Sequence, residues 1–231
     1  MCHGLNETLA PAPSECDRKA PYMPHRTLYF AAQSTWRPSP GLADRQGDGQ
    51  FGEARYRPPQ METNDAVIDL TVACVTSVKN ATGLELDLTQ DTLPILDHYA
   101  ELAESPRGEV VSLLAPMCGA YFGELIRREL DDGVWHVDPE KHSEWRLAFE
   151  RSSLRFNPLG IALEVLLRQD VPNWGAHLQT PVEDQLRVKK ALDVYGDVRD
   201  QDYYRFSVRF EAIEQAYLAL LNNPAGMRPK G

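Results

Sequence analysis

CGAYFGELIRRELDDGVW, residues 118–135, decides the fold, because it contains a helix, the end of that helix and the start of a strand. Gly119 and Gly123 stand one helical turn apart and leave a strip without side chains, which another element can approach closely. Each glycine costs roughly 1 kcal/mol of helix propensity. We therefore expect a neighbouring helix to pack against this strip, with a bound ligand as the alternative.

The same helix extends upstream and ends within the quoted stretch. An apolar stripe with spacings of four, three, four and four residues predicts one buried face: Val110, Leu114, Met117, Tyr121 and Leu125. Pro116 removes a backbone donor inside this pattern, so we expect a kink or a restart near Ala115. Asp131, Asp132 and Gly133 predict the helix end, with Gly133 in the left-handed conformation.

Three short strands are predicted after the helix, at residues 134–138, 145–150 and 154–157. In the second, Trp145, Leu147 and Phe149 alternate with more polar positions, which is typical of a strand buried on one face. The economical arrangement is a small antiparallel sheet. The run IALEVLLRQ, residues 161–169, fits either a helix or a fourth strand.

Helices are predicted on both sides of this central part. The spacing of Val67, Leu70, Cys74 and Val78 favours a helix, with a strand as the alternative because of the Val and Thr content. The segment LDLTQDTLPILDHYAELAE, residues 86–104, predicts a helix of three to four turns with Thr89 as its N-cap. A start at Asp91 or Thr92 is the alternative, because Pro94 is best tolerated in a first turn.

Near the carboxy terminus, Thr180, Pro181 and Glu183 predict a capping box with proline at the first helical position. The last helix is predicted from a long apolar stripe, which consists of Phe206, Phe210, Ile213, Tyr217 and Leu220.

Composition and charge limit the classes of function. The chain has 231 residues, 42% of them hydrophobic, and a formal net charge of −10. Residues 1–60 hold seven Lys or Arg and six Asp or Glu, a net of +1, which leaves −11 for residues 61–231. An acidic domain lacks the attraction that draws proteins to nucleic acids and anionic membranes. No apolar run approaches the roughly 18 to 20 residues of a spanning helix, so we expect a soluble protein without nucleic-acid or membrane partners.

The first sixty residues differ from the rest of the chain. They hold eight of the 17 prolines and show no helical or strand period, so we expect residues 1–60 to be a disordered tail. Translation beginning at Met61 is an alternative interpretation. Within the tail, residues 21–33, PYMPHRTLYFAAQ, form the piece most suited to docking. One mainly helical α+β domain is expected over residues 61–223, followed by a flexible terminus at residues 224–231.

The cysteines and the amino terminus bear on the compartment. Cys2, Cys16, Cys74 and Cys118 are widely spaced and form no CxxC pair, so a structural zinc site is not indicated. The first residues lack a basic segment followed by an apolar one, which a secretory signal requires. We therefore expect a cytoplasmic protein.

Common catalytic and metal-binding patterns are missing from the sequence. It contains no GxSxG, GxxxxGK[ST], GxGxxG or HExxH motif, and no cofactor is indicated. The loop at residues 136–144 carries His136 and His142 among acidic residues, but their spacing has no preferred ligand geometry. A solvated acidic loop is the favoured interpretation, and we predict no metal site.

Glu124 is the centre of the one candidate site. It precedes Arg128 by four residues, which predicts a solvated ion pair worth only tenths of a kcal/mol. The alternative is a carboxylate held by Arg127 or Arg128 at the edge of a pocket walled by Tyr121 or Trp135. No second carboxylate or histidine stands at a spacing that would define a catalytic mechanism.

Two segments of this region resemble an uncharacterised family of small bacterial domains. In that family a motif LDxSxxSLxxLD begins one helix, a GAYxGE helix follows, and a tryptophan opens a strand; residues 86–158 show this order, with Thr89 and Thr92 where serines are usual. Its signature positions correspond to Asp87, Leu93, Leu96, Asp97, Gly119, Tyr121, Gly123, Glu124 and Trp135. The resemblance implies a fold and a bacterial origin, and no activity.

These observations favour a non-catalytic interaction or regulatory protein whose acidic surface binds a basic protein partner. The alternative is an enzyme of unknown reaction around Tyr121, Glu124, Arg128 and Trp135. The two differ in one expectation. A ligand site buries Glu124 in a concave pocket beside Arg or His, whereas an interaction module leaves it in a surface pair or in helix packing.

Overall fold

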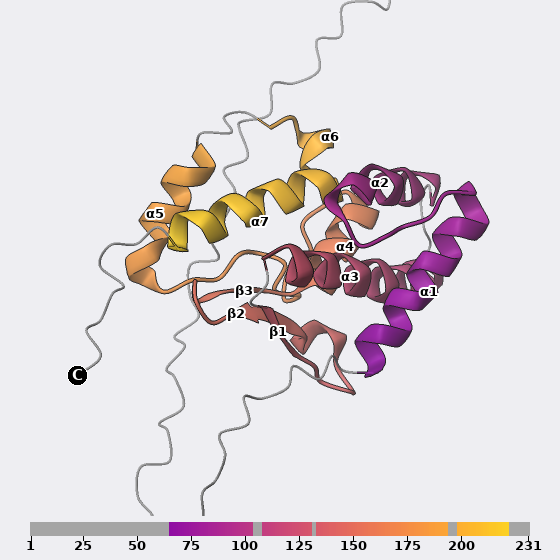
Figure 1. Cartoon of the computed structure of the whole chain (residues 1–231), viewed down its shortest axis with the longest axis horizontal. Helices are drawn as coiled ribbons and strands as arrows, with labels where there is room; N and C mark the ends of the chain where they lie inside the picture. The colour runs from indigo at the N-terminus through magenta and orange to yellow at the C-terminus, as the bar shows by residue number, and fades with distance from the viewer. Residues whose placement is uncertain (1–64, 104–107, 131–132, 194–197, 222–231) are drawn as a thin grey trace, which may run out of the picture.

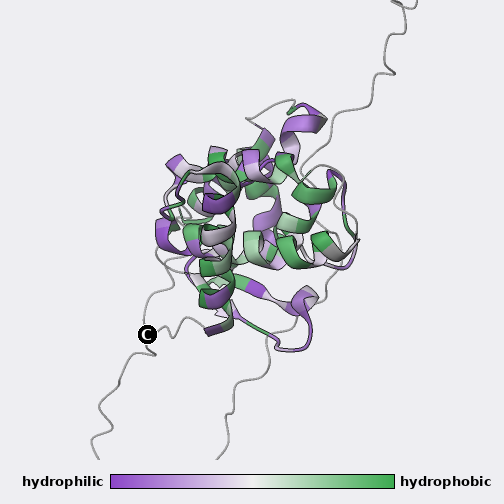
Figure 2. Cartoon of the chain, turned by 90° about the vertical axis from the view of Figure 1, so that its right-hand side faces the viewer, coloured by the Kyte–Doolittle hydropathy of each residue, from purple (hydrophilic) through white to green (hydrophobic). Residues whose placement is uncertain are grey.

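A computed structural model describes residues 65–103, 108–130, 133–193 and 198–221 (Figure 1). These residues form a mainly helical α+β structure with a small antiparallel sheet, which confirms the predicted fold class. Along the helices, hydrophobic and hydrophilic residues alternate, as expected of amphipathic elements around a core (Figure 2). The predicted tail at residues 1–60, the alternative start at Met61 and the terminus at residues 224–231 lie outside the described residues.

The central element is α3, Gly108–Leu130, which packs against α1, Asp65–Thr82, and α4, Pro158–Leu167 (Figure 1). A Cβ atom on Gly119 would lie only 2.5 Å from the Cα atom of Leu159 at the start of α4. The predicted close helix contact is therefore confirmed at Gly119. At Gly123 the neighbour is different, because a Cβ there would overlap the indole ring of Trp135.

Three expectations for this helix need correction. Helix α3 runs unbroken across Pro116, so there is no restart near Ala115, and the burial of its middle turns against α1 and α4 compensates for the lost backbone bond. Gly133 begins a strand and does not adopt a positive φ. A glycine fits there for another reason: Arg127, Leu147 and Phe149 lie so close that a side chain would crowd them. Residues 110–130 are also long and apolar enough to span a membrane, contrary to expectation, although 78% of that stretch is buried inside the structure.

Helix α1 resolves the ambiguity between helix and strand. Its buried side includes Val67, Cys74 and Val78, while Gly83 ends the helix with φ of +74°. The loop that follows leads into the short 3₁₀ helix η2, Gln90–Thr92, and helix α2, Leu93–Leu102.

The predicted capping role of Thr89 is wrong. Its hydroxyl makes no capping bond and donates instead to Asp87 Oδ1 at 2.6 Å, and its backbone N–H donates to the same oxygen at 2.9 Å. The Asp87 side chain thus organises the turn, because its carboxylate accepts a hydrogen bond from the N–H group two residues later.

The predicted three-stranded sheet is confirmed, with β1, Gly133–His136, β2, Arg146–Phe149, and β3, Leu154–Phe156, in the order β1-β2-β3. A short 3₁₀ helix, η3, His142–Glu144, precedes β2. Trp135 pairs with Leu147, and Leu147 pairs with Phe156, in antiparallel register.

The segment after the sheet is the helix α4, not a fourth strand. Its N-cap is Asn157, whose Oδ1 accepts from the N–H of Leu159 at 2.9 Å. Asn157 Nδ2 also donates to the carbonyl of His142 at 3.0 Å, which ties the start of α4 to the loop before β2.

The carboxy-terminal part contains α5, Val182–Leu192, α6, Asp200–Tyr203, and α7, Phe206–Leu221. The predicted capping box is wrong, since Pro181 occupies the N-cap position in an extended conformation and Thr180 is one residue too far from the helix; its hydroxyl is buried without a partner. The apolar stripe predicted for α7 is confirmed, because all five of its residues are buried.

Candidate functional site

A groove of about 270 Å³ lies between α1, α3 and the loop before η2. Most of its wall is hydrocarbon. The lining residues are Ile68, Thr71, Val72, Val75, Thr76, Leu88, Glu124 and Arg128. An engineered cavity of about 150 Å³ holds a benzene ring, so this groove has room for at least one apolar side chain.

Helix α1 supplies the long wall of the groove. Ile68 is 44% exposed and Val72 58% exposed, although the opposite side of the helix is buried in the core. The hydroxyls of Thr71 and Thr76 donate to the carbonyls four residues earlier, at 2.7 and 2.9 Å, so they turn toward the helix backbone. The wall therefore presents mainly carbon atoms to anything that enters the groove.

Leu88 reaches the groove through an unusual backbone conformation. Its φ is +64°, in the left-handed region that a branched apolar residue rarely adopts. The hydroxyl oxygen of Tyr121 accepts from the Leu88 N–H at 3.0 Å and lies 3.0 Å from Thr92 Oγ1. Strain of this kind persists where the surroundings hold it, and it gathers at functional sites. Here it places the Leu88 side chain in the groove wall.

Tyr121 itself has no access to the groove. Its side chain is fully buried, and burial raises the pKa of its hydroxyl despite the bonds from Thr92 and Leu88. The residue therefore acts as a support that holds the loop from Asp87 to Thr92 against α3.

Glu124 is buried and paired with Arg127, which the alternative interpretation named, and not with Arg128. Arg127 donates to both of its carboxylate oxygens, from Nε to Oε1 at 2.9 Å and from Nη2 to Oε2 at 3.0 Å. Trp135 Nε1 donates to Oε1 at 2.6 Å. The predicted solvated pair with Arg128 is wrong, because the indole of Trp135 draws the carboxylate toward β1, where Arg127 also lies.

Arg128 does not pair with Glu124 and stays exposed at the groove. Among the residues that the structure describes, no carboxylate pairs with it. Of the four candidate site residues, Glu124 and Arg128 thus line the groove. The other two support it: Tyr121 bonds to Leu88, and Trp135 bonds to Glu124.

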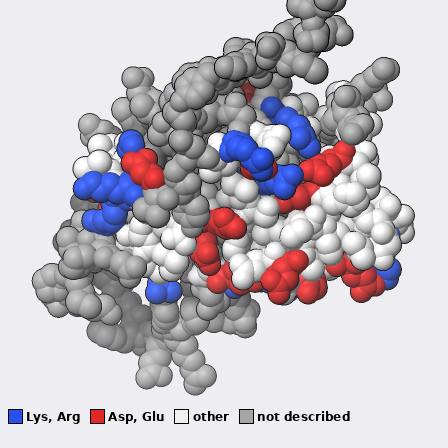
Figure 3. Space-filling view, turned by 90° about the horizontal axis from the view of Figure 1, so that it is seen from above, with Lys and Arg blue, Asp and Glu red and all other residues white. Residues whose placement is uncertain are grey.

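Acidic residues surround this side of the molecule. Residues 65–102 contain seven Asp or Glu and one Lys, a net of −6 out of the −11 of residues 61–231. Asp65, Ile68, Asp69 and Val72 are spaced three, one and three residues apart and so share one face of α1. In Figure 3, acidic side chains form a row along the edge of the molecule on the side where α1 and α2 lie.

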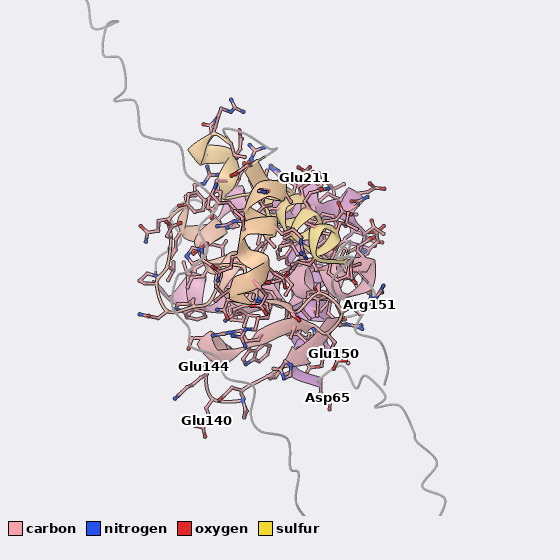
Figure 4. All side chains as sticks on the ribbon, turned by 90° about the vertical axis from the view of Figure 1, so that its left-hand side faces the viewer. Asp65, Glu140, Glu144, Glu150, Arg151 and Glu211 are labelled. Carbon is pink, nitrogen blue, oxygen red and sulfur yellow. The ribbon has the colours of Figure 1, made fainter. Side chains whose placement is uncertain are left out.

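The acidic surface continues from the start of α1 toward the sheet. Figure 4 shows Asp65 projecting on the same side of the molecule as Glu140, Glu144 and Glu150, which belong to the loops around β2. All four side chains are exposed. Their negative charges favour a partner of positive charge.

A second polar cluster, which the sequence did not reveal, lies buried between α4 and α7. Arg209 Nη2 pairs with Glu164 Oε2 at 2.6 Å, and Arg209 Nη1 donates to the Tyr203 hydroxyl at 2.8 Å. Glu164 is completely buried, and its other oxygen accepts from the N–H of Val171. The signal for this pair was a single carboxylate inside the apolar run IALEVLL and an arginine next to Phe210 on an apolar face.

Asp97 is another buried carboxylate with a structural role. It accepts from the N–H of Phe206 at 2.5 Å and from the hydroxyl of Ser207 at 2.6 Å, at the start of α7. Burial raises its pKa, although these hydrogen bonds act in the opposite direction. The bond joins α2 to α7 across more than one hundred residues of sequence.

Metal ligands do not gather in the described parts of the chain, where no group of three or more His, Cys, Asp or Glu side chains is placed to hold an ion. In the acidic loop, Asp138 Oδ1 accepts from the N–H groups of Glu140 and Lys141. That carboxylate therefore shapes the turn.

Comparison of the chain with models of protein families, with curated proteins and with solved structures gives no match. The resemblance found in residues 86–158 thus gains no support from these comparisons. In the structure its signature positions are internal links: Asp87 shapes a turn, Asp97 caps α7, Tyr121 holds Leu88, and Glu124 bonds to Trp135.

Proposed function

We propose that the protein is a non-catalytic, cytoplasmic interaction protein that binds a basic protein partner through the groove between α1 and α3. The observation that carries the proposal is an apolar groove with exposed Ile68 and Val72 on the same helical face as Asp65 and Asp69. Protein interfaces combine an apolar centre with a polar rim in this way. The partner segment that fits has one or two apolar side chains flanked by Lys or Arg.

Charge around the groove favours such a partner. Asp65 and Asp69, both exposed on the face of α1 that carries Ile68 and Val72, attract a basic surface and raise the rate of encounter. The apolar wall then supplies the contact area that determines how long the complex lasts. Arg128, exposed at the other side of the groove, can donate to a backbone carbonyl or carboxylate of the bound segment.

The enzymatic alternative fits the groove less well. Glu124 is buried beside Arg127, as a ligand site would require, yet three of the roughly four acceptor positions of its carboxylate are already used by Arg127 and Trp135. Among the groove-lining residues only Glu124 and Arg128 are titratable, so no second acid or base stands beside them, and the hydroxyls of Thr71 and Thr76 donate to the helix backbone.

The experiment that tests the proposal places a photo-crosslinking amino acid at Val72 in the full-length chain and irradiates it in the native host. A matched control carries the same amino acid at Val182, which is 79% exposed on α5, far from the groove. We expect one protein to crosslink at position 72 and not at 182, and its encounter rate with the purified chain to fall as salt rises. Crosslinking equal at both positions, or an encounter rate independent of salt, would contradict the proposal.

A further inference from the structure

The groove in the described structure leaves apolar surface exposed to water. Ile68 and Val72 together with the half-buried Val75 and Leu88 form its wall, and no described residue covers them. Apolar surface of this kind is normally covered by another segment or a partner. Several segments outside the described residues place an apolar side chain beside Lys or Arg, and one of them also contains the start of the longest apolar run of residues 1–64.

That segment is HRTLYF, residues 25–30. Residues 28–32, LYFAA, form the longest uninterrupted apolar run in residues 1–64, and Arg26 precedes the run by two positions. The proposed partner segment has one or two apolar side chains flanked by Lys or Arg. In residues 25–30, Leu28 and Phe30 are such apolar side chains and Arg26 is the flanking basic residue. The segment thus resembles the proposed ligand of the groove.

The length and end point of the intervening chain permit the contact. Phe30 is 35 residues from Asp65, and the groove begins at Ile68, within the first turn of α1. A random-coil chain of this length has an end-to-end distance of about 30 Å. Ile68 and Val72 lie only about 5 and 10 Å along α1 from Asp65. Tethering at this range gives an effective concentration of about 1 mM, so an affinity of about 1 mM already fills the groove half of the time.

Charge favours the same contact. Residues 1–60 carry a net of +1 and residues 61–231 a net of −11. Arg26 stands next to the apolar run, and Asp65 and Asp69 stand next to Ile68 and Val72 on one face of α1. A bound segment therefore brings opposite charges together where the apolar contact is made.

We propose that residues 25–30 dock in the groove between α1 and α3 and compete there with the partner. This inference rests on the proposed function, because it assigns to the same groove an internal competitor. If residues 25–30 occupy the groove half of the time, the apparent affinity for a partner falls twofold. Tighter docking lowers that affinity further, in proportion to the fraction of grooves left open.

The test observes the groove of the full-length chain directly, by NMR of the methyl groups of Ile68, Val72 and Leu88. The variant Tyr29→Ser with Phe30→Ser removes two aromatic rings from the segment, and Trp36→Ser removes one from the same region six residues later as a matched control. All three substitutions lie outside the described elements. We expect the double variant to shift the groove methyl resonances and the Trp36→Ser chain to keep the wild-type positions, independent of protein concentration.

Two outcomes would overturn the docking proposal. Identical groove resonances in all three chains mean that residues 25–30 do not occupy the groove. Resonances that move with protein concentration mean that a second copy, and not the tethered segment, fills it. Neither outcome contradicts the proposed function. That function is tested separately, by the dissociation constant of the crosslinked partner for a Val72 variant. Loss of the segment from the groove should raise the affinity for that partner at least twofold.

Discussion

The close contact between α3 and α4 makes a measurable prediction for Gly119→Ala. The added methyl carbon would lie 2.5 Å from Leu159 Cα, whereas carbon atoms pack at about 3.5–4.0 Å, so the two helices must separate by about 1 Å. The obstacle is backbone, and Asn157 holds the N–H of Leu159 at 2.9 Å, so we expect the upper end of the usual overpacking cost, about 3 kcal/mol. Alanine returns about 1 kcal/mol of helix propensity, which leaves a net loss of about 2 kcal/mol.

Urea unfolding followed by tryptophan fluorescence measures this loss in the full-length chain. A loss of about 2 kcal/mol corresponds to a Tm lower by about 4–8 °C for a protein of this size. The matched control is Gly108→Ala in the same helix, because a Cβ there meets nothing within 4 Å. This control should be neutral or more stable by up to roughly 1 kcal/mol. Equal urea midpoints for the two alanine variants would contradict a close backbone contact at Gly119.

Three further predictions follow from the contacts around the groove. Glu124→Gln should cost about 2–4 kcal/mol in urea unfolding, because it leaves the mostly buried Arg127 without its countercharge; a change below about 0.5 kcal/mol would mean that the pair is solvated. Tyr121→Phe should cost about 1 kcal/mol and weaken partner binding, because the Leu88 N–H loses its acceptor; unchanged binding would show that the Leu88 conformation does not matter to the groove. Hydrogen bonds from Thr89 lower the pKa of Asp87, so its contribution to stability is present above the unfolded pKa of about 4 and is lost as the pH falls through the lower folded value. Asp87→Asn should therefore lose less stability than wild type between pH 4 and pH 2, and parallel losses in the two chains would contradict the assignment.

The elements of the fold were predictable where a single period dominates. The buried residues of α7 stand at helical spacing over four turns, and Trp145, Leu147 and Phe149 alternate as a strand requires. Cap positions were less predictable, because they depend on a shift of one residue. Thr180 fails as a cap since Pro181 takes that position, and Thr89 makes no capping bond because its hydroxyl donates to Asp87. Such local competition between neighbouring polar side chains has no signature in spacing.

The candidate site was predictable only in part, for a physical reason. Glu124 and Arg128 lie on one helix, so their proximity follows from their spacing. The choice of Arg127 over Arg128 depends on Trp135, which reaches Glu124 from a strand eleven residues away. The groove itself needs Ile68 and Val72 from a helix more than fifty residues earlier. Both are exposed, but the sequence alone does not show whether an isoleucine or a valine is exposed or buried.

The affinity of the crosslinked partner for two valine variants shows whether that partner binds in the groove between α1 and α3. Val72→Asn and Val182→Asn each replace an exposed valine by the same neutral polar residue, so neither alters the charge of the chain. Removing a valine contact of about 1.5–3 kcal/mol predicts that Val72→Asn raises the dissociation constant roughly tenfold or more, while Val182→Asn leaves it within about twofold. Equal dissociation constants for wild type and Val72→Asn would show that the partner does not bind in the groove between α1 and α3.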